Sequence, residues 1–221
     1  MTLTRDEVTA GMLAELDTFG ELVRGLDAGA LDTPTRCAGW TVRDVAAHVT
    51  GTLADITSGN AAGQGQPEVT ARQVAERQGR TGSELADELH GARKIVADLL
   101  AAFDDAAWAA PAPAGYDGTL GQGIEALWYD EFLHGDDIRT ALGLAPVTPL
   151  PSLHVAVVHI ADILGRRGWG PATLAFDGLP RVDVGGGGRV VDGDAYAFLL
   201  AATGRRDPAT LGLTADVNVY A

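Results

Sequence analysis

Histidine and carboxylate side chains occur together in two segments of the chain that have helical spacing. One segment ends at His48, and the other contains Asp130, Glu131 and His134. Asp130 precedes His134 by one helical turn, so both side chains would lie on the same helix face. Catalytic zinc sites bind the metal through three such protein ligands and keep a fourth position open. The residues therefore predict a site for a divalent metal, with zinc as the expected ion.

The same segment leaves two other assignments open. Glu131 could replace Asp130 as the carboxylate ligand, because it also lies about one turn from His134. Alternatively, both carboxylates could face solvent while His134 pairs with Asp137, and no metal would bind. Several acidic groups on the core-facing side of a helix are costly without a compensating cation, so we favour the metal site.

The composition is that of a globular protein and excludes several partners. The chain has 221 residues, of which 46% are hydrophobic and 21% charged. Its net charge of −14 repels phosphate groups, so we expect no binding to nucleic acid or to acidic membranes. Neither a spanning apolar run nor an apolar signal core at the N-terminus is evident. We therefore expect a cytoplasmic protein, either a monomer or a small homo-oligomer, that acts on small molecules.

The remaining reactive side chains receive structural assignments. Cys37 is the single cysteine, which excludes an intramolecular disulfide and a cysteine-based zinc cluster. Since no base lies beside it in its segment, we expect Cys37 to pack rather than to act as a nucleophile. Arg139 should pair with Asp136 or another acidic side chain. No role is assigned to the other three histidines, His90, His154 and His159.

Four long amphipathic patterns predict helices in the first part of the chain. Their boundaries are marked by capping residues, such as Thr4 followed by Glu7, and by glycine or proline. The predicted helices span residues 4–26, 41–58, 83–103 and 119–142. A polar loop is expected at residues 60–67. Four long helices joined by loops indicate a bundle, with His48 on the second helix and His134 on the fourth.

Prolines at positions 146, 149 and 151 predict a domain boundary. We therefore divide the chain into residues 1–147, the helical bundle, and residues 148–221, a small α+β domain. The second domain should contain helices at 152–166 and 194–203 and β-prone segments at 172–176, 181–184 and 190–191. The glycine run Gly185–Gly188 is expected to be a hairpin turn. The predicted fold class is mainly α, with a small mixed domain at the end.

Two motifs give the chain a family resemblance. The segments Cys37–His48 and Asp130–Gly143 resemble the mycothiol-dependent maleylpyruvate isomerase family within the DinB-like superfamily. The segment Val190–Arg206 resembles the small, sterol-carrier-like C-terminal domain of that family. The resemblance covers most of the chain and implies that the bundle is DinB-like.

The resemblance also implies a cofactor and a set of site residues. It implies a divalent metal, usually zinc, bound by His48, Asp130 and His134, with mycothiol as cofactor or co-substrate. The isomerase family has glutamate where this chain has Asp130, so the shorter side chain is a departure, and Glu131 stays an alternative ligand. The arginine implicated in catalysis corresponds to Arg205.

The combined expectation is a metal-dependent enzyme that uses a low-molecular-weight thiol, mycothiol. A thiol bound to a divalent cation loses its proton, and the thiolate would attack an electrophilic small molecule in an S-transfer or a thiol-assisted isomerisation. Two alternatives remain. Metal-bound water in the open position would make the protein a hydrolase or lyase, and a scaffold without catalysis would make it a metal- or ligand-binding protein.

Overall fold

The computed structural model describes residues 3–113 and 116–221. The described chain divides into two compact units, Leu3–Val147 and Thr148–Ala221. The candidate metal ligands belong to the first unit, and Arg205 belongs to the second.

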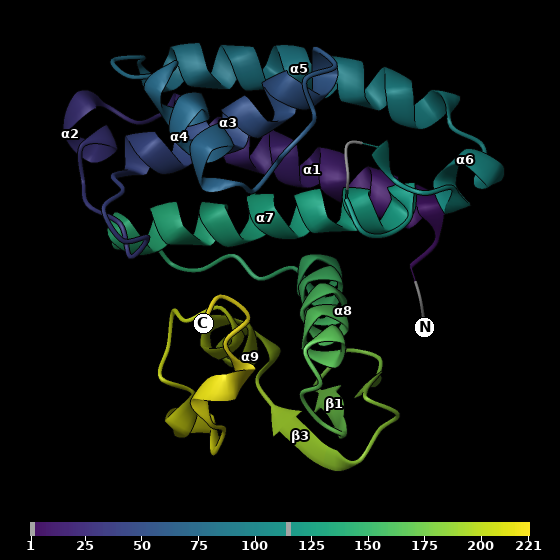
Figure 1. Ribbon diagram of the computed structural model, residues 1–221. Coiled ribbons are helices and arrows are strands. Elements are labelled where there is room, and N and C mark those ends of the chain that lie inside the picture. Colours follow the sequence, from purple (N-terminus) through teal and green to yellow (C-terminus); the bar gives the residue numbers. More distant parts are fainter. Residues whose placement is uncertain (1–2, 114–115) are drawn as a thin grey trace. The chain divides into compact units, whose positions relative to one another are not determined.

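The first unit is built on four long helices (Figure 1). Both α1 and α3 pack against α5 and against α7, so each long helix has two long neighbours, as in a four-helix bundle. Side chains buried in α1 recur every three or four residues, as the predicted apolar stripe requires. The expected mainly helical fold, with a four-helix bundle, is confirmed. The four helices are α1 (Arg5–Arg24), α3 (Val42–Thr57), α5 (Gly82–Ala102) and α7 (Leu120–Ala141).

Each long helix begins with a reciprocal pair of hydrogen bonds between its N-cap threonine and the residue three positions later. Thr41 with Asp44 begins α3, which carries His48. Thr119 with Gln122 begins α7, which carries Asp130 and His134. The third long helix starts at Gly82 after its cap Thr81, slightly earlier than predicted.

Three short helices were not predicted: α2 (Ala28–Leu31), α4 (Pro67–Ala75) and α6 (Asp105–Ala109). The most consequential is α4, because it follows the predicted polar loop and packs on α3. Its single buried residue is Gln73, which is 0% exposed, so the segment has no apolar stripe to detect. A Cβ atom at Gly51 of α3 would lie 2.7 Å from the Gln73 Cβ atom, so glycine permits this close approach.

Another close approach fixes α7 against α1. A Cβ atom at Gly11 would lie 1.9 Å from the ring of Trp128, which is only 1% exposed. The Trp128 Nε1 group donates a hydrogen bond to Glu15 at 3.3 Å. Because overpacking a core forces backbone shifts, glycine at position 11 keeps α7 at the distance that places its histidine against α3.

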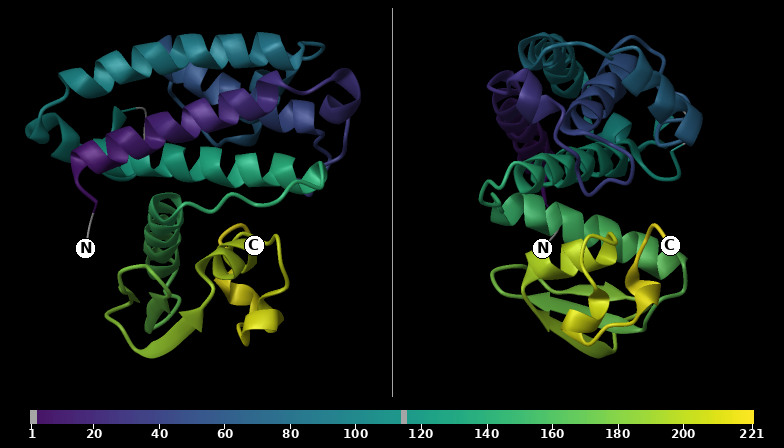
Figure 2. Two further views of the ribbon diagram at one scale, coloured as in Figure 1. Left: turned by 180° about the vertical axis from the view of Figure 1, so that it is seen from behind. Right: turned by 90° about the vertical axis from the view of Figure 1, so that its left-hand side faces the viewer.

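The second unit combines two helices with a small sheet (Figure 2). The sheet has the strand order β2-β1-β3, in which β1 is antiparallel to β2 and parallel to β3. None of the helices in the described part of the chain is both long and apolar enough to cross a membrane. The elements are α8 (Leu150–Arg166), β1 (Ala172–Phe176), β2 (Val182–Val184), β3 (Arg189–Gly193), α9 (Ala195–Ala202), η2 (Pro208–Leu211) and η3 (Ala215–Val217).

The prediction that Gly185–Gly188 forms a hairpin turn is wrong. This run connects β2 to β3, which lie on opposite sides of β1 and do not pair with each other. The paired strands β1 and β2 are joined instead by residues 177–181. A Cβ atom at Gly188 would lie 2.7 Å from the carbonyl oxygen of Pro171, so the run needs glycine to pass close to the start of β1.

Candidate metal centre

Side chains from α3 and α7 bring two imidazoles to one carboxylate. The His48 Nε2 atom lies 3.6 Å from Oδ2 of Asp130, and the His134 Nε2 atom lies 3.5 Å from Oδ1 of the same residue. Ligand atoms of the three residues all lie within 4.8 Å of one another. The structure therefore brings together the set His48, Asp130 and His134, and its donors are those that divalent zinc takes in catalytic sites.

The other nitrogen of His48 is fixed by α4. His48 Nδ1 lies 3.1 Å from Oε1 of Gln73, whose Nε2 group donates to Asp55 and to Gln64, each at 2.8 Å. Since a carboxylate only accepts hydrogen bonds, Asp55 fixes the orientation of the Gln73 amide. The Gln73 oxygen then faces His48, so Nδ1 carries the proton. Nε2 therefore faces Asp130, to which it can donate a hydrogen bond when protonated, and the same atom would offer its lone pair to a metal.

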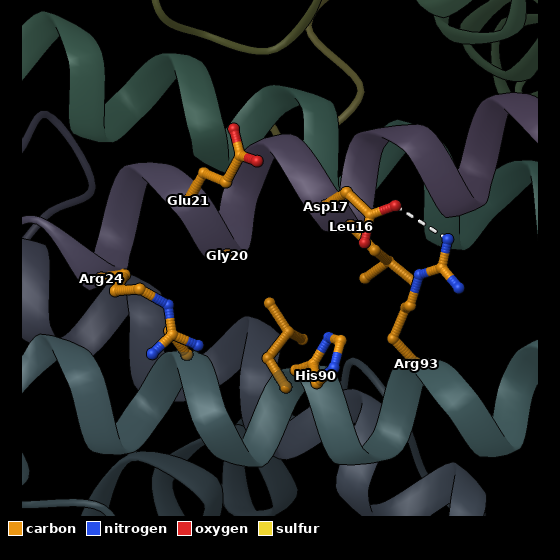
Figure 3. Close-up of a pocket in the computed structure, with 9 residues that line it drawn as sticks. Leu16, Asp17, Gly20, Glu21, Arg24, His90 and Arg93 are labelled. Atoms are coloured by element: carbon orange, nitrogen blue, oxygen red, sulfur yellow. Dashed lines mark hydrogen bonds and ion pairs between the residues drawn. The ribbon is translucent and has the colours of Figure 1, made fainter.

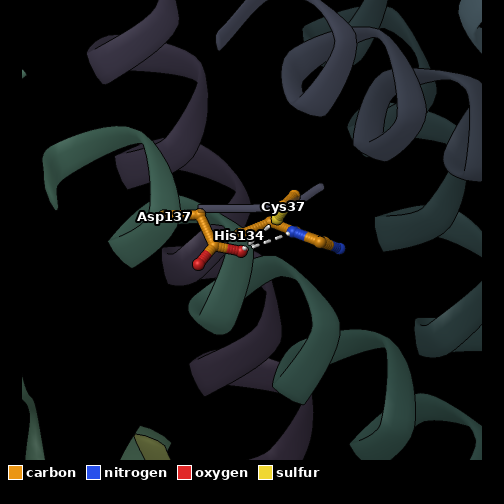
Figure 4. Close-up of side chains that lie close together, drawn as sticks. All are labelled: Cys37, His134 and Asp137. Atoms are coloured by element: carbon orange, nitrogen blue, oxygen red, sulfur yellow. Dashed lines mark hydrogen bonds and ion pairs between the residues drawn. The ribbon is translucent and has the colours of Figure 1, made fainter. Parts of the chain in front are cut away.

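The other nitrogen of His134 is fixed in a similar way. His134 Nδ1 lies 3.0 Å from Oδ2 of Asp137, whose side chain is fully buried (Figure 4). The same oxygen accepts a hydrogen bond from the Cys37 thiol at 3.1 Å, and the other oxygen accepts one from Arg36 at 2.6 Å. Hydrogen bonds to the second nitrogen of a metal-binding histidine set its tautomer and ring orientation. The pairing of His134 with Asp137 is therefore compatible with a metal site.

Asp136, one of the acidic partners considered for Arg139, is compensated by a different arginine. This buried carboxylate pairs with Arg36, from the loop before α3, rather than with Arg139 on its own helix. Arg36 thus bridges Asp136 and Asp137, and the two carboxylates in turn raise the pKa of its guanidinium against the opposing effect of burial. The buried carboxylates of Asp136 and Asp137 are therefore compensated by one cation from another part of the chain.

An aromatic ring covers the two histidines. The Trp40 ring centroid lies 5.4 Å from that of His48 and 6.3 Å from that of His134, and the Trp40 and His134 rings are stacked. His48 is 8% exposed, whereas the Asp130 side chain is 31% exposed. The centre is therefore shielded on the Trp40 side and accessible at Asp130, as a site that binds an external ligand requires.

The electrostatics of His48 already favour a positive charge. Burial lowers its pKa, but the hydrogen bond and the negative charge of Asp130, together with the Gln73 hydrogen bond, outweigh this and raise the pKa above the ordinary histidine value. Asp130 thus stabilises a cation between itself and the imidazole. A divalent metal would take the place of that proton.

Glu131 lies in a different environment from Asp130. It is 2% exposed, and neither of its carboxylate oxygens has a hydrogen-bond partner among the described residues. Burial raises its pKa well above the usual range, and the negative charges of Asp130 and Glu15 raise it further. Of the two candidate carboxylates, only Asp130 lies with both histidines in a possible metal-binding group within the described ranges.

Cys37, His134 and Asp137 form a second group whose ligand atoms lie within 4.8 Å of one another (Figure 4). A metal there would compete with Arg36, which already pairs with Asp137 in a partly buried position. Removing a compensating partner from a buried charge is costly. We therefore assign Cys37 and Asp137 to the support of His134, in keeping with the packing role expected for the cysteine.

The remaining predicted residues lie elsewhere. His90 lines a pocket of about 370 Å³ between α1 and α5, where Arg93 pairs with Asp17 at 2.8 Å (Figure 3). It belongs to none of the possible metal-binding groups found in the described residues. Arg205 follows α9 in the second unit, is partly buried, and donates a hydrogen bond to the Thr203 carbonyl at 3.3 Å.

Gln73 and Arg36, which help to orient the two histidines, were not predicted from the sequence. Gln73 lies on the short polar helix α4, and its contact with His48 joins segments that no periodicity relates. For Arg36, the signal was its position directly before the Cys37–His48 motif. The excess of acidic residues around His134 indicated a missing cation, and Arg36 supplies part of it.

The four-helix fold and the two-histidine, one-carboxylate group define a class of helical-bundle proteins with a potential metal centre. The family described as the mycothiol maleylpyruvate isomerase N-terminal domain matches residues 12–139. This chain belongs to that family, which confirms the resemblance seen in the two motifs and the expectation of an enzyme.

Solved structures show the same fold over nearly the whole chain. The crystal structure of the mycothiol-dependent maleylpyruvate isomerase has a TM-score of 0.66 and 15% sequence identity, covering 93% of each chain. A histidine-to-alanine mutant of that enzyme gives the same score at 16% identity, again with 93% of both chains covered. None of the curated proteins matches the sequence.

We predict that His48→Ala, His134→Ala and Asp130→Ala each abolish stoichiometric metal binding, because each removes one of the three converging ligands. Glu131→Ala and the control His90→Ala should keep the metal, since neither side chain belongs to the group. Metal content after equilibration with zinc would be measured by atomic emission. Stoichiometric metal in the His48 or His134 variant would disprove the site.

We also predict that Gln73→Leu weakens metal binding by about 10–100-fold while all three ligands remain, because His48 loses the acceptor that fixes its tautomer. Gln78→Leu is the matched control, since Gln78 is exposed and bonds Asp44 rather than a histidine. Competition with a chromophoric chelator would give both affinities. Equal affinity in the two variants would show that Gln73 only packs α4.

Proposed function

We propose that this protein is a metal-dependent enzyme that uses mycothiol in an S-transfer or a thiol-assisted isomerisation of an electrophilic small molecule. The observation that carries the proposal is the convergence of two Nε2 atoms on Asp130 while both Nδ1 atoms are held by buried acceptors. Such preorganised imidazoles suit a cation with an open position.

A divalent metal held by His48, Asp130 and His134 would supply a Lewis acid that lowers the pKa of a bound thiol. The chain's own residues do the rest of the positioning. Gln73 and Asp137 hold the imidazoles in the tautomer that leaves Nε2 free, and Trp40 shields them from water. The exposed edge of Asp130 leaves room for the thiol to approach.

Membership of the family supports the use of a thiol, because the description of the family names a mycothiol maleylpyruvate isomerase. The similar solved enzyme is described as mycothiol-dependent, but at 15% identity the likeness shows the fold and not the substrate. This chain has Asp130 where the isomerase family has glutamate, so its carboxylate lies one methylene closer to the helix backbone. We therefore propose mycothiol as the thiol that this protein uses.

We predict that the zinc-loaded protein binds mycothiol saturably and releases protons near neutral pH, because coordination converts a thiol into a thiolate. The cobalt-substituted protein should develop a sulfur-to-metal charge-transfer band on addition of the thiol. Calorimetry in buffers of different ionisation enthalpy and absorption spectroscopy would measure these effects. Metal binding without proton release or the band would favour an enzyme that activates water instead.

For Arg205 we propose a role in holding a carboxylate or stabilising developing negative charge, as the resemblance implies. Arg205→Ala should lower kcat by about 10²-fold or more with unchanged metal content and Tm. Arg206→Ala, which alters the adjacent exposed arginine, is the matched control. Steady-state kinetics and thermal melting would separate the roles. Full activity of the Arg205 variant would assign that arginine to the surface.

A further inference from the structure

Side chains of α3, α5 and α7 line an apolar cavity in the first unit. Figure 1 shows the end of this unit where α5 leads into α6 and α7 begins. The volume of the cavity is about 500 Å³, within the range of small-molecule sites. The side chains that line it are all apolar, including Leu53, Ile56, Leu100, Leu120, Ile124 and Leu127. Several of these side chains, such as Leu53 and Leu100, are almost fully shielded from solvent.

A neighbouring hollow, which shares part of its lining with the cavity, has different chemistry. This hollow of about 230 Å³ shares Ile56, Leu120 and Leu127 with the cavity and adds the polar side chains of Gln64 and Gln66. No basic side chain lines either hollow in the described residues. A carboxylate or phosphate would lose its hydration here without finding a partner, so the cavity suits an uncharged apolar group.

The cavity lies along the helices that carry the metal centre. Leu127 precedes Asp130 by one turn of α7, and Leu53 and Ile56 follow His48 on α3. At 1.5 Å per residue, the lining of α7 begins roughly 4.5 Å from Asp130 and extends to roughly 15 Å at Leu120. These spacings along α7 are within the length of one small molecule.

A hydrogen-bond network joins Gln64 in the neighbouring hollow to the centre. Gln64 accepts from Gln73, and Gln73 accepts from His48. A group bound in the neighbouring hollow would contact Gln64. Gln64 is connected through Gln73 to the candidate metal ligand His48. This connection argues for the substrate of that centre as the occupant, rather than for an unrelated apolar molecule.

We propose that this cavity binds an alkyl or aryl group of the electrophilic substrate, so that the preferred electrophile carries an uncharged apolar tail rather than a second carboxylate. The identification of the occupant as the substrate rests on the proposed function. The binding of an apolar group in the cavity does not. Each methylene buried in the cavity should improve kcat/KM about fourfold, because burial of apolar surface is favourable.

The first experiment measures binding without turnover. N-phenyl-1-naphthylamine, an uncharged fluorescent probe, should bind the zinc-loaded protein saturably. Leu120→Trp fills the cavity far from Asp130 and should weaken that binding at least tenfold, whereas Ile95→Trp, at an exposed position of α5 outside the cavity, should not. Thermal melting and metal content would show that both variants are folded. Equal probe binding by both variants, or none by the unchanged protein, would overturn the cavity as a binding site.

The second experiment uses 1,2-epoxyalkanes of increasing length with mycothiol. In each reaction the thiol sulfur bonds to the terminal carbon, the carbon–oxygen bond breaks, and the thiol proton ends on the oxygen. We expect kcat/KM to rise with chain length in the unchanged protein and in Ile95→Trp, and to level off earlier in Leu120→Trp. A kcat/KM independent of length would overturn the assignment of the tail.

The two experiments test the apolar binding site separately from the proposed thiol-dependent function. Probe binding that is lost only in Leu120→Trp supports the apolar site even if no epoxide reacts. If no epoxide reacts and mycothiol does not bind, the proposed function is overturned, but the apolar binding site is not. Mycothiol binding with length-independent turnover would instead keep the function and reject the apolar substrate.

Discussion

The centre depends on one constraint, which is that each histidine has its Nδ1 atom held by a buried acceptor. His48 is held by Gln73 at 3.1 Å and His134 by Asp137 at 3.0 Å. With both Nδ1 atoms held in this way, the two Nε2 atoms face Asp130. The accessory elements serve this arrangement, because α4 supplies Gln73 and the loop before α3 supplies Arg36, which pairs with Asp137.

The charges around the centre follow from the same requirement. Asp137 is fully buried and Asp55 nearly so, and each is paired with an arginine from a distant part of the chain. Buried ion pairs of this kind contribute little net stability but are costly to break, so they hold their neighbours in fixed orientations. Glu131 shows the alternative outcome, since without a described partner its raised pKa favours the neutral acid. Two adjacent carboxyl groups on α7 thus lie in different surroundings, because Asp130 faces the two histidines and Glu131 is buried without a described partner.

Backbone packing sets the distances on which this chemistry depends. Glycine at position 11 lets α1 receive the Trp128 ring, and glycine at position 51 lets α4 approach α3. An added Cβ atom at Gly11 would push α7, which carries Asp130, away from α1, and one at Gly51 would push α4, which carries Gln73, away from α3 and His48. The apolar cavity between α3, α5 and α7 is bounded by the same helices, so the metal centre and the proposed tail site share one rigid framework.

The sequence by itself determined the four long helices, through apolar periodicity and threonine caps, and it indicated His48, Asp130 and His134 through spacing and motif. These features are local, because a helical period reports which residues share a face. Tertiary structure alone decided that Asp130 rather than Glu131 lies with the histidines, and that Gln73 from a polar segment orients one of them. Likewise, the order β2-β1-β3 overturned the hairpin expected at Gly185–Gly188. Such partners depend on how closely distant segments approach, which is set by packing and leaves no period in the sequence.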